Sequence, residues 1–161
     1  MLLAYVDRKE EALTLLKKSS YGNQQPIPLL LSHAQCIHEH MHELSLLEEI
    51  QLYQSLSHLP IYPEHLLWDI TETLRLNKHL LSLKNIMHTL KACNRLHFKN
   101  ELMLNAFMEI IYRKLPLQQQ SYRDEVLETI NRFKLNTTAA RAIRSNCTHT
   151  SVQQLLVGIN S

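Results

Sequence analysis

The chain has 161 residues, of which 45% are hydrophobic and 20% are charged, so it has enough apolar material for a folded core and is not disordered as a whole. Its 2 Gly and 5 Pro are too few for strands joined by tight turns, and its 3 Cys favour a reducing compartment over a disulfide scaffold. The net charge of +2 is unevenly divided. Residues 1–80 contain 6 Lys and Arg against 10 Asp and Glu, whereas residues 81–161 contain 11 against 5, which favours a polyanionic partner for the second half.

Apolar residues recur at helical spacing along the whole chain, as at Leu46, Ile50 and Tyr53. Pro60 ends one such segment and Pro63 opens the next, because proline suits the first turn of a helix but not its interior. The pattern predicts helices over residues 8–19, 27–42, 44–58, 63–76, 82–95, 100–114, 121–134, 138–146 and 151–157. No apolar run is long enough to predict a membrane-spanning helix, and the first residues do not resemble a signal peptide.

A self-match at an offset of 37 residues relates segment 90–98 to segment 127–135. Three of its positions are identical: Leu90, Asn94 and Arg95 recur as Leu127, Asn131 and Arg132. The second helix of each predicted pair starts near residues that also stand 37 apart, namely Pro26, Pro63, Asn100 and Thr137. A fixed offset is typical of repeat arrays. We therefore expect an all-α fold, an α-solenoid of about four helical pairs in one domain, 1–161, with repeats of about 8–43, 44–80, 81–117 and 118–158. An irregular helical bundle is the alternative.

The step between the two helices of a repeat, Leu-His-Phe-Lys-Asn-Glu-Leu-Met at residues 96–103, resembles the degenerate helical repeats of the heptatricopeptide and FAST-kinase-like proteins. The resemblance covers residues 44–146 and rests on a hydrophobic pattern. It implies a mostly mitochondrial protein that acts on RNA or in a mitochondrial ribosome. The small C-terminal α/β domain that often ends such proteins is not visible in this sequence, which puts any catalytic role of such a domain in doubt.

Two columns of polar residues recur at the same offset: His58, Arg95 and Arg132, and beside them Ser57, Asn94 and Asn131. In stacked repeats they would form a ladder of guanidinium and amide groups, which suits phosphate oxygens. The basic surface would be widened by Lys91, Lys99, Lys134, Arg141 and Arg144. The alternative is that both columns simply lie at helix C-termini, where the helix dipole stabilises a positively charged side chain.

The other groups of polar residues do not predict a metal-binding or catalytic site. His33, Cys36 and His40 share one helical face, but a closed zinc site needs a fourth ligand from elsewhere, such as His65 or His79. A polar helix face with a packed Cys36 is the favoured interpretation, so we expect no metal and no cofactor. No catalytic motif is present, and Trp68 is either a core wedge or an interface anchor.

The sequence therefore predicts a non-enzymatic helical-repeat binding or scaffold protein. The expected partners are RNA or the protein subunits of an RNA–protein assembly such as a mitochondrial ribosome, without a membrane or a small-molecule substrate. The expected location is mitochondrial, with the cytoplasm as the alternative. A protein–protein adaptor that uses a helical groove is the second hypothesis.

Overall fold

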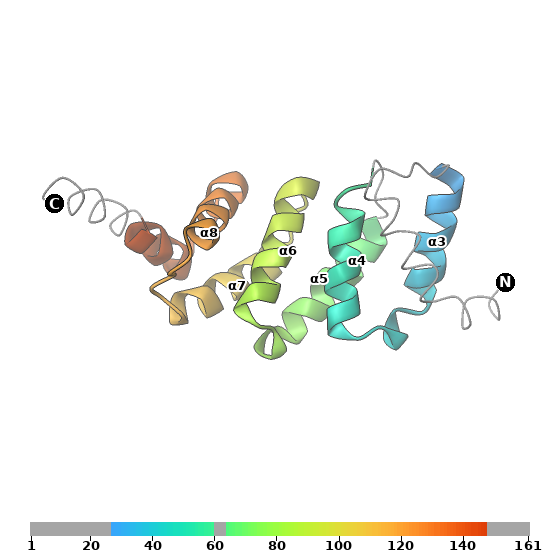
Figure 1. Cartoon of the computed structure of the whole chain (residues 1–161), viewed down its shortest axis with the longest axis horizontal. Coiled ribbons are helices and arrows are strands. Elements are labelled where there is room, and N and C mark those ends of the chain that lie inside the picture. Colours follow the sequence, from blue (N-terminus) through green and yellow to red (C-terminus); the bar gives the residue numbers. More distant parts are fainter. Residues whose placement is uncertain (1–26, 60–63, 148–161) are drawn as a thin grey trace, which may run out of the picture. The chain divides into compact units, whose positions relative to one another are not determined.

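The computed structural model describes residues 27–59 and 64–147, and every regular element in these ranges is a helix (Figure 1). The predicted all-α class is confirmed. The α-helices are α3 (Ile27–Glu39), α4 (Leu46–Leu56), α5 (Glu64–Leu76), α6 (Leu83–Leu96), α7 (Glu101–Arg113), α8 (Gln120–Phe133) and a last one over residues 138–147; the 3-10 helices are η1 (Met41–Glu43) and η2 (Lys78–Leu80). Each lies within a few residues of its predicted position. The predicted helices 8–19 and 151–157 lie outside the described residues.

The chain divides into two compact units, Met1–Leu74 (unit 1) and Arg75–Ser161 (unit 2). The described part of unit 1 contains α3, η1, α4 and most of α5. That of unit 2 contains η2, α6, α7, α8 and helix 138–147. The boundary between the two units lies near the end of α5.

Short polar side chains cap the N-termini of α4, α6, α7 and helix 138–147. Oγ of Ser45 accepts a hydrogen bond from the backbone N–H of Glu48, and the Glu48 carboxylate accepts one from the Ser45 N–H, a reciprocal capping box. The side chains of Ser82, Asn100 and Thr137 each accept from the N–H three residues on. Each cap satisfies a donor that the first turn leaves unpaired and contributes about 1 kcal/mol.

The turn that precedes α4 has the same backbone conformation as the turn that precedes α6. His40 and Asn77, 37 residues apart, have φ and ψ of −119° and 25° and of −108° and 23°. Each is followed by a 3-10 helix, an extended leucine and a capping serine. The ends of α6 and α8 also agree, because His97 and Lys134 both have a φ of 53°. At these two pairs of positions the backbone conformations therefore match.

The core of unit 1 is formed by the inner faces of its helices. Tyr53 and Leu56 of α4, and Leu66 and Ile70 of α5, are fully buried. Burying side chains of this size contributes about 1.5–3 kcal/mol each. The carboxylate of Asp69 on α5 lies 2.5 Å from Nε2 of His38, which links α5 to α3.

In unit 2, α6 packs against α8 and α7, and α6 and α8 lie side by side in Figure 1. The core of this unit includes Ile86, Leu90, Phe107, Val126 and Ile130, all 1% exposed or less. Across both described ranges, no helix combines the length and the apolar character needed to cross a membrane.

Candidate nucleic-acid interface

Charge is divided sharply between the two compact units. The sequence of unit 1 contains 4 Lys and Arg against 10 Asp and Glu, a net charge of −6. The sequence of unit 2 contains 13 against 5, a net charge of +8. A positive excess of this size in one unit attracts polyanions such as RNA.

Residues 19–74 contain no Lys or Arg, but they contain seven acidic residues and six histidines. The described helices of unit 1 therefore offer a phosphate group no permanent cation. His58, the first member of the predicted ladder, belongs to this unit and is exposed just after the C-cap of α4, Ser57. Since histidine carries little charge at neutral pH, electrostatic capture of phosphate depends on unit 2.

Four side chains form a stripe on α6, which we call the α6 basic ridge: Lys84, His88, Lys91 and Arg95. Positions i, i+4, i+7 and i+11 lie on one face of an α-helix and extend over roughly 16 Å. The two lysines and the arginine are exposed, and the histidine is half-buried. Because α6 contains no Asp or Glu, no acid of the same helix offsets these charges.

The positive charges of the α6 basic ridge lower the stability of α6 itself. Like charges one turn apart repel by about 0.2–0.5 kcal/mol, and Lys84 lies in the first turn, where the helix dipole disfavours a cation. Burial lowers the pKa of His88, and the positive charges of Lys84 and Lys91 lower this pKa further. The helix-dipole explanation therefore fits Arg95, in the last turn, but not Lys84.

Arg132, the third member of the predicted ladder, is engaged on the protein surface. Its Nη2 donates to Oε1 of Glu128 at 2.9 Å, and its Nη1 lies 2.7 Å from Nδ1 of His97. Since His97 is the C-cap of α6, this guanidinium ties α8 to the end of α6. A phosphate at Arg132 would have to compete with the Glu128 carboxylate for this guanidinium group.

Asn94, from the second predicted column, is a core residue and does not form part of a surface ladder. It is 5% exposed, and its Nδ2 donates to Oε1 of Glu125 at 2.7 Å and to Oγ1 of Thr129 at 2.9 Å. Both amide hydrogens are used to hold α6 against α8. The expectation that this amide contacts phosphate conflicts with its position, because a phosphate cannot reach it without separating the two helices.

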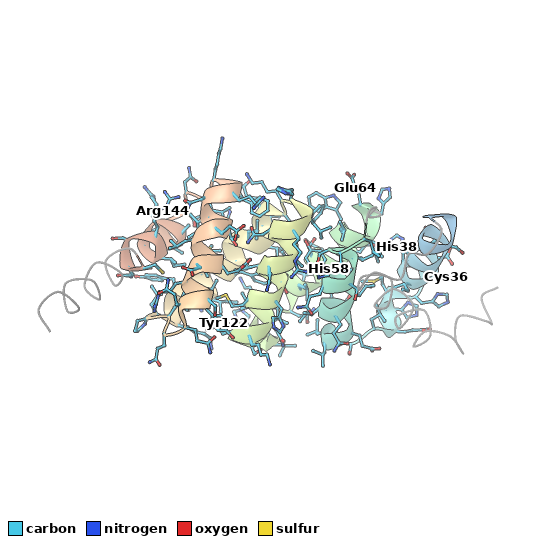
Figure 2. The ribbon with its side chains drawn as sticks, turned by 45° about the horizontal axis from the view of Figure 1, so that its top comes forward. Cys36, His38, His58, Glu64, Tyr122 and Arg144 are labelled. Atoms are coloured by element: carbon cyan, nitrogen blue, oxygen red, sulfur yellow. The ribbon has the colours of Figure 1, made fainter. Side chains whose placement is uncertain are left out.

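The other two members of that column differ from Asn94 and from each other. Oγ of Ser57 donates to the carbonyl oxygen of Gln54 at 2.5 Å. Asn131 is exposed, and its Oδ1 accepts a hydrogen bond from Nη2 of Arg144 on helix 138–147. Figure 2 labels Arg144. The column therefore contains one helix-end hydroxyl, one buried amide and one surface amide.

The remaining predicted contacts are cations on the surface of unit 2: Lys99, Lys134, Arg141 and Arg144. Arg123, in contrast, is 6% exposed, and its Nη1 donates to the carbonyl oxygen of Leu117 at 2.5 Å. It anchors the segment before α8 and does not contribute to a binding surface. Thus most of the positive charge of unit 2, but not all of it, is accessible to a partner.

Sequence reasoning missed Lys84 and His88, because it searched for a column across repeats at an offset of 37. The spacing of lysine, histidine and arginine within α6 was the available signal, since positions i, i+4, i+7 and i+11 define a helix face without knowledge of any neighbour.

The histidine-rich segment shows structural contacts. Nδ1 of His40 lies 2.9 Å from the carbonyl oxygen of Cys36, and His38 contacts Asp69. Among the described residues, which do not include the side chain of His33, no group of three or more His, Cys, Asp or Glu is arranged to hold a metal ion.

Comparison of the chain with models of protein families, with curated proteins and with solved structures found no match.

Proposed function

We propose that the protein is a helical-repeat scaffold that captures the phosphate backbone of RNA with the α6 basic ridge. The observation that carries the proposal is the stripe of exposed cations on α6 without a compensating acid on that helix. Charges arranged at a cost to helix stability are expected where a ligand of opposite charge compensates for them. The exposed cations Lys99, Lys134, Arg141 and Arg144 would extend the same interaction.

The chemistry of the ridge favours backbone contacts over the reading of bases. Its side chains are lysine, arginine and histidine, which bind phosphate oxygens, and none is a large aromatic platform for base stacking. The binding we propose is therefore electrostatic, salt-dependent and largely independent of sequence. A role within an RNA–protein assembly fits such binding better than recognition of one target sequence.

The α-solenoid with a 37-residue period is part of the same proposal. It is supported by turns of equal conformation before α4 and α6, by serine caps at Ser45 and Ser82, and by left-handed residues at His97 and Lys134. The mitochondrial location and the ribosomal setting follow from the family resemblance of the repeats. Fluorescence microscopy of the tagged chain in cells tests the mitochondrial location.

The test is RNA binding, measured by fluorescence anisotropy with a labelled oligouridine and a labelled hairpin at two salt concentrations. The variant is Lys84→Gln/Lys91→Gln, and its matched control is Arg113→Gln/Lys114→Gln, which removes the same charge from exposed positions at the end of α7, outside α6. We expect the ridge variant to bind about tenfold more weakly and to reduce the slope of log K against log salt by about 1.4. The control should change affinity by less than about twofold.

Two further results decide between the ridge and the ladder. We expect Arg95→Gln to weaken binding and Arg132→Gln to change it little, because Arg132 is held by Glu128. Equal losses in both would support the ladder instead. Absence of binding at low salt would remove the RNA proposal, and a salt-tolerant protein partner unaffected by these variants would favour the adaptor hypothesis.

A further inference from the structure

His88 differs from the other members of the α6 basic ridge because its charge depends on pH near neutrality. It stands four residues after Lys84 and three before Lys91, so the three side chains share one face of α6. Both lysines are exposed and stay charged throughout the physiological range, whereas an imidazole gains or loses its proton between about pH 5 and 8. The permanent cations alone account for the proposed phosphate contacts, so the histidine needs a separate explanation.

In the protein without a ligand, the surroundings of His88 disfavour its protonation. Burial lowers the pKa of His88 below its ordinary value of 6.5, and the positive charges of Lys84 and Lys91 lower this pKa further. The helix supplies no opposing charge, because α6 contains no Asp or Glu. His88 is therefore mostly neutral at pH 7, and a proton taken up there would place a third positive charge between two lysines.

The charged groups of the two helices that pack against α6 do not reverse this effect. The carboxylates of α7 and α8 belong to Glu101, Glu109, Asp124, Glu125 and Glu128. The three on α8 accept hydrogen bonds from other side chains of the protein, and the two on α7 are exposed. The arginines of the same helices are Arg113, Arg123 and Arg132. The charges that shift the pKa of His88 are those of Lys84 and Lys91, on α6 itself.

We propose that the α6 basic ridge binds RNA and a proton together, with His88 taking up a proton from the solvent when a phosphate backbone binds. The inference rests on the proposed function and concerns the regulation of the same site. A phosphate that contacts Lys84 and Lys91 brings negative charge between them, beside the imidazole. The imidazolium then faces an opposite charge, and its N–H groups donate to phosphate oxygens in charge-assisted hydrogen bonds.

The direction of the pH dependence follows from which state holds the proton more tightly. The complex has a phosphate near His88, whereas in the free protein burial and two lysines lower the pKa of His88. The complex is therefore protonated at a higher pH than the free protein. Affinity for RNA is lowest where the imidazole is neutral in both states, and it rises as the pH falls through the range in which only the complex is protonated.

The test is binding of the full chain to oligouridine carrying a pH-insensitive label, followed by fluorescence anisotropy between about pH 5.5 and about pH 8 at constant salt. We expect affinity to rise about fivefold as the pH falls across this range. His88→Gln should bind within about twofold of the unsubstituted chain at the alkaline end and should lose the rise. His88→Lys makes the charge permanent, so it should bind tightly at both ends of the range.

Two control variants isolate His88 from other groups that titrate in the same range. His79→Gln removes an exposed histidine of η2, outside α6, and should keep the rise in affinity. Glu49→Gln removes a carboxyl whose pKa is raised by burial to about 7, and it should also keep the rise.

Nuclear magnetic resonance provides a second readout, at the imidazole itself. The ring C–H signals of isotope-labelled histidine are recorded against pH with and without oligouridine, and the signal missing in His88→Gln identifies His88. We expect this signal to titrate at a higher pH when RNA is bound, and the signal of His79 to shift less. A His88 titration that RNA leaves unchanged would overturn the proposal.

The coupling and the RNA proposal fail in different ways. Affinity that is constant over the pH range, or that rises equally in His88→Gln, would overturn the coupling and leave RNA binding by the ridge intact. Equal losses of the rise in His88→Gln and His79→Gln would assign the effect to the overall charge of the protein and would also overturn the coupling. Absence of RNA binding at every pH would overturn both.

Discussion

Asn94 of α6 donates a hydrogen bond of 2.7 Å from its Nδ2 to Oε1 of Glu125 on α8, and the same amide nitrogen donates to Oγ1 of Thr129. Oγ1 of Thr129 donates in turn to the backbone carbonyl oxygen of Glu125, so the acceptor role of this hydroxyl toward Asn94 is fixed. Oδ1 of Asn94 is buried without a hydrogen-bond partner in the described structure. The amide is oriented by two acceptors and cannot be reversed without losing both bonds.

Replacing Asn94 should therefore cost more than replacing its counterpart 37 residues on. Asn94→Ala removes two hydrogen bonds from a buried position and should lower the free energy of unfolding by about 1–3 kcal/mol. Asn131→Ala removes one bond at the surface and should change it by less than about 0.5 kcal/mol. Urea denaturation followed by circular dichroism measures both values. Equal effects would mean that the contact between α6 and α8 does not depend on this network.

Glu49 should make stability depend on pH. It is 2% exposed in α4, and burial raises its pKa from 4.5 to about 7. The folded state therefore binds the proton more tightly than the unfolded state does. Below about pH 4.5 Glu49 is protonated in both states and carries no penalty. As the pH rises from 4.5 to about 7, deprotonation increasingly favours the unfolded state, and above pH 7 the free energy of unfolding is lower by a constant amount on the order of 3 kcal/mol.

Glu49→Gln should remove this dependence. Relative to the unsubstituted chain, the variant should gain stability steadily between pH 4.5 and about pH 7 and then hold the gain, as measured by urea denaturation at several pH values. Glu39→Gln, at an exposed glutamate of α3, is the control. A constant difference between the Glu49→Gln variant and the unsubstituted chain over this range would contradict the assignment.

The left-handed residue after α8 offers a stabilising substitution. Lys134 has φ and ψ of 53° and 47°, a conformation that crowds a Cβ atom and that glycine adopts without this cost. Lys134→Gly should raise the free energy of unfolding by about 0.5–1 kcal/mol. His97→Gly should gain less, because it removes the ring that contacts Arg132. Thermal unfolding measures both, and a similar gain from Lys134→Ala would show that backbone strain is not the cause.

Substitution of Lys84 should change the stability of the protein and its affinity for RNA in opposite directions. Lys84→Glu places a carboxylate in the first turn of α6, where the helix dipole favours it, and should raise the free energy of unfolding by about 0.5 kcal/mol. The same change reverses one charge of the α6 basic ridge and should weaken RNA binding at low salt by about tenfold or more. Thermal unfolding and fluorescence anisotropy test the two effects. A less stable variant would mean that Lys84 has a structural role in the helix.

The helices were predictable because their ends are encoded locally. Ser45 and Ser82 carry their own capping groups, and Pro63 precedes the first residue of α5, so no knowledge of neighbouring helices was needed. Helical spacing likewise identified the buried faces, as at Ile50 and Tyr53.

The roles of polar residues were less predictable, because they depend on helices that come together only in the folded chain. Asn94 and Asn131 match in sequence, yet one faces Glu125 and Thr129 while the other faces Arg144. Arg132 is a surface cation, as its column suggests, but Glu128 and His97 hold its guanidinium group. A match at a fixed offset shows that two residues occupy similar positions along the chain. It does not identify the residue that each of them contacts in the folded protein.

The stretch without Lys or Arg also has a practical consequence for protein chemistry. Trypsin cleaves only after these two residues, so a complete digest returns residues 19–75 as one peptide, while the cation-rich remainder is cut into many. That peptide contains Trp68 and is recognised by its absorbance as well as its mass. Its cleavage site after Arg75 lies within α5, and the rate at which the native chain is cut there reports how often the end of α5 opens.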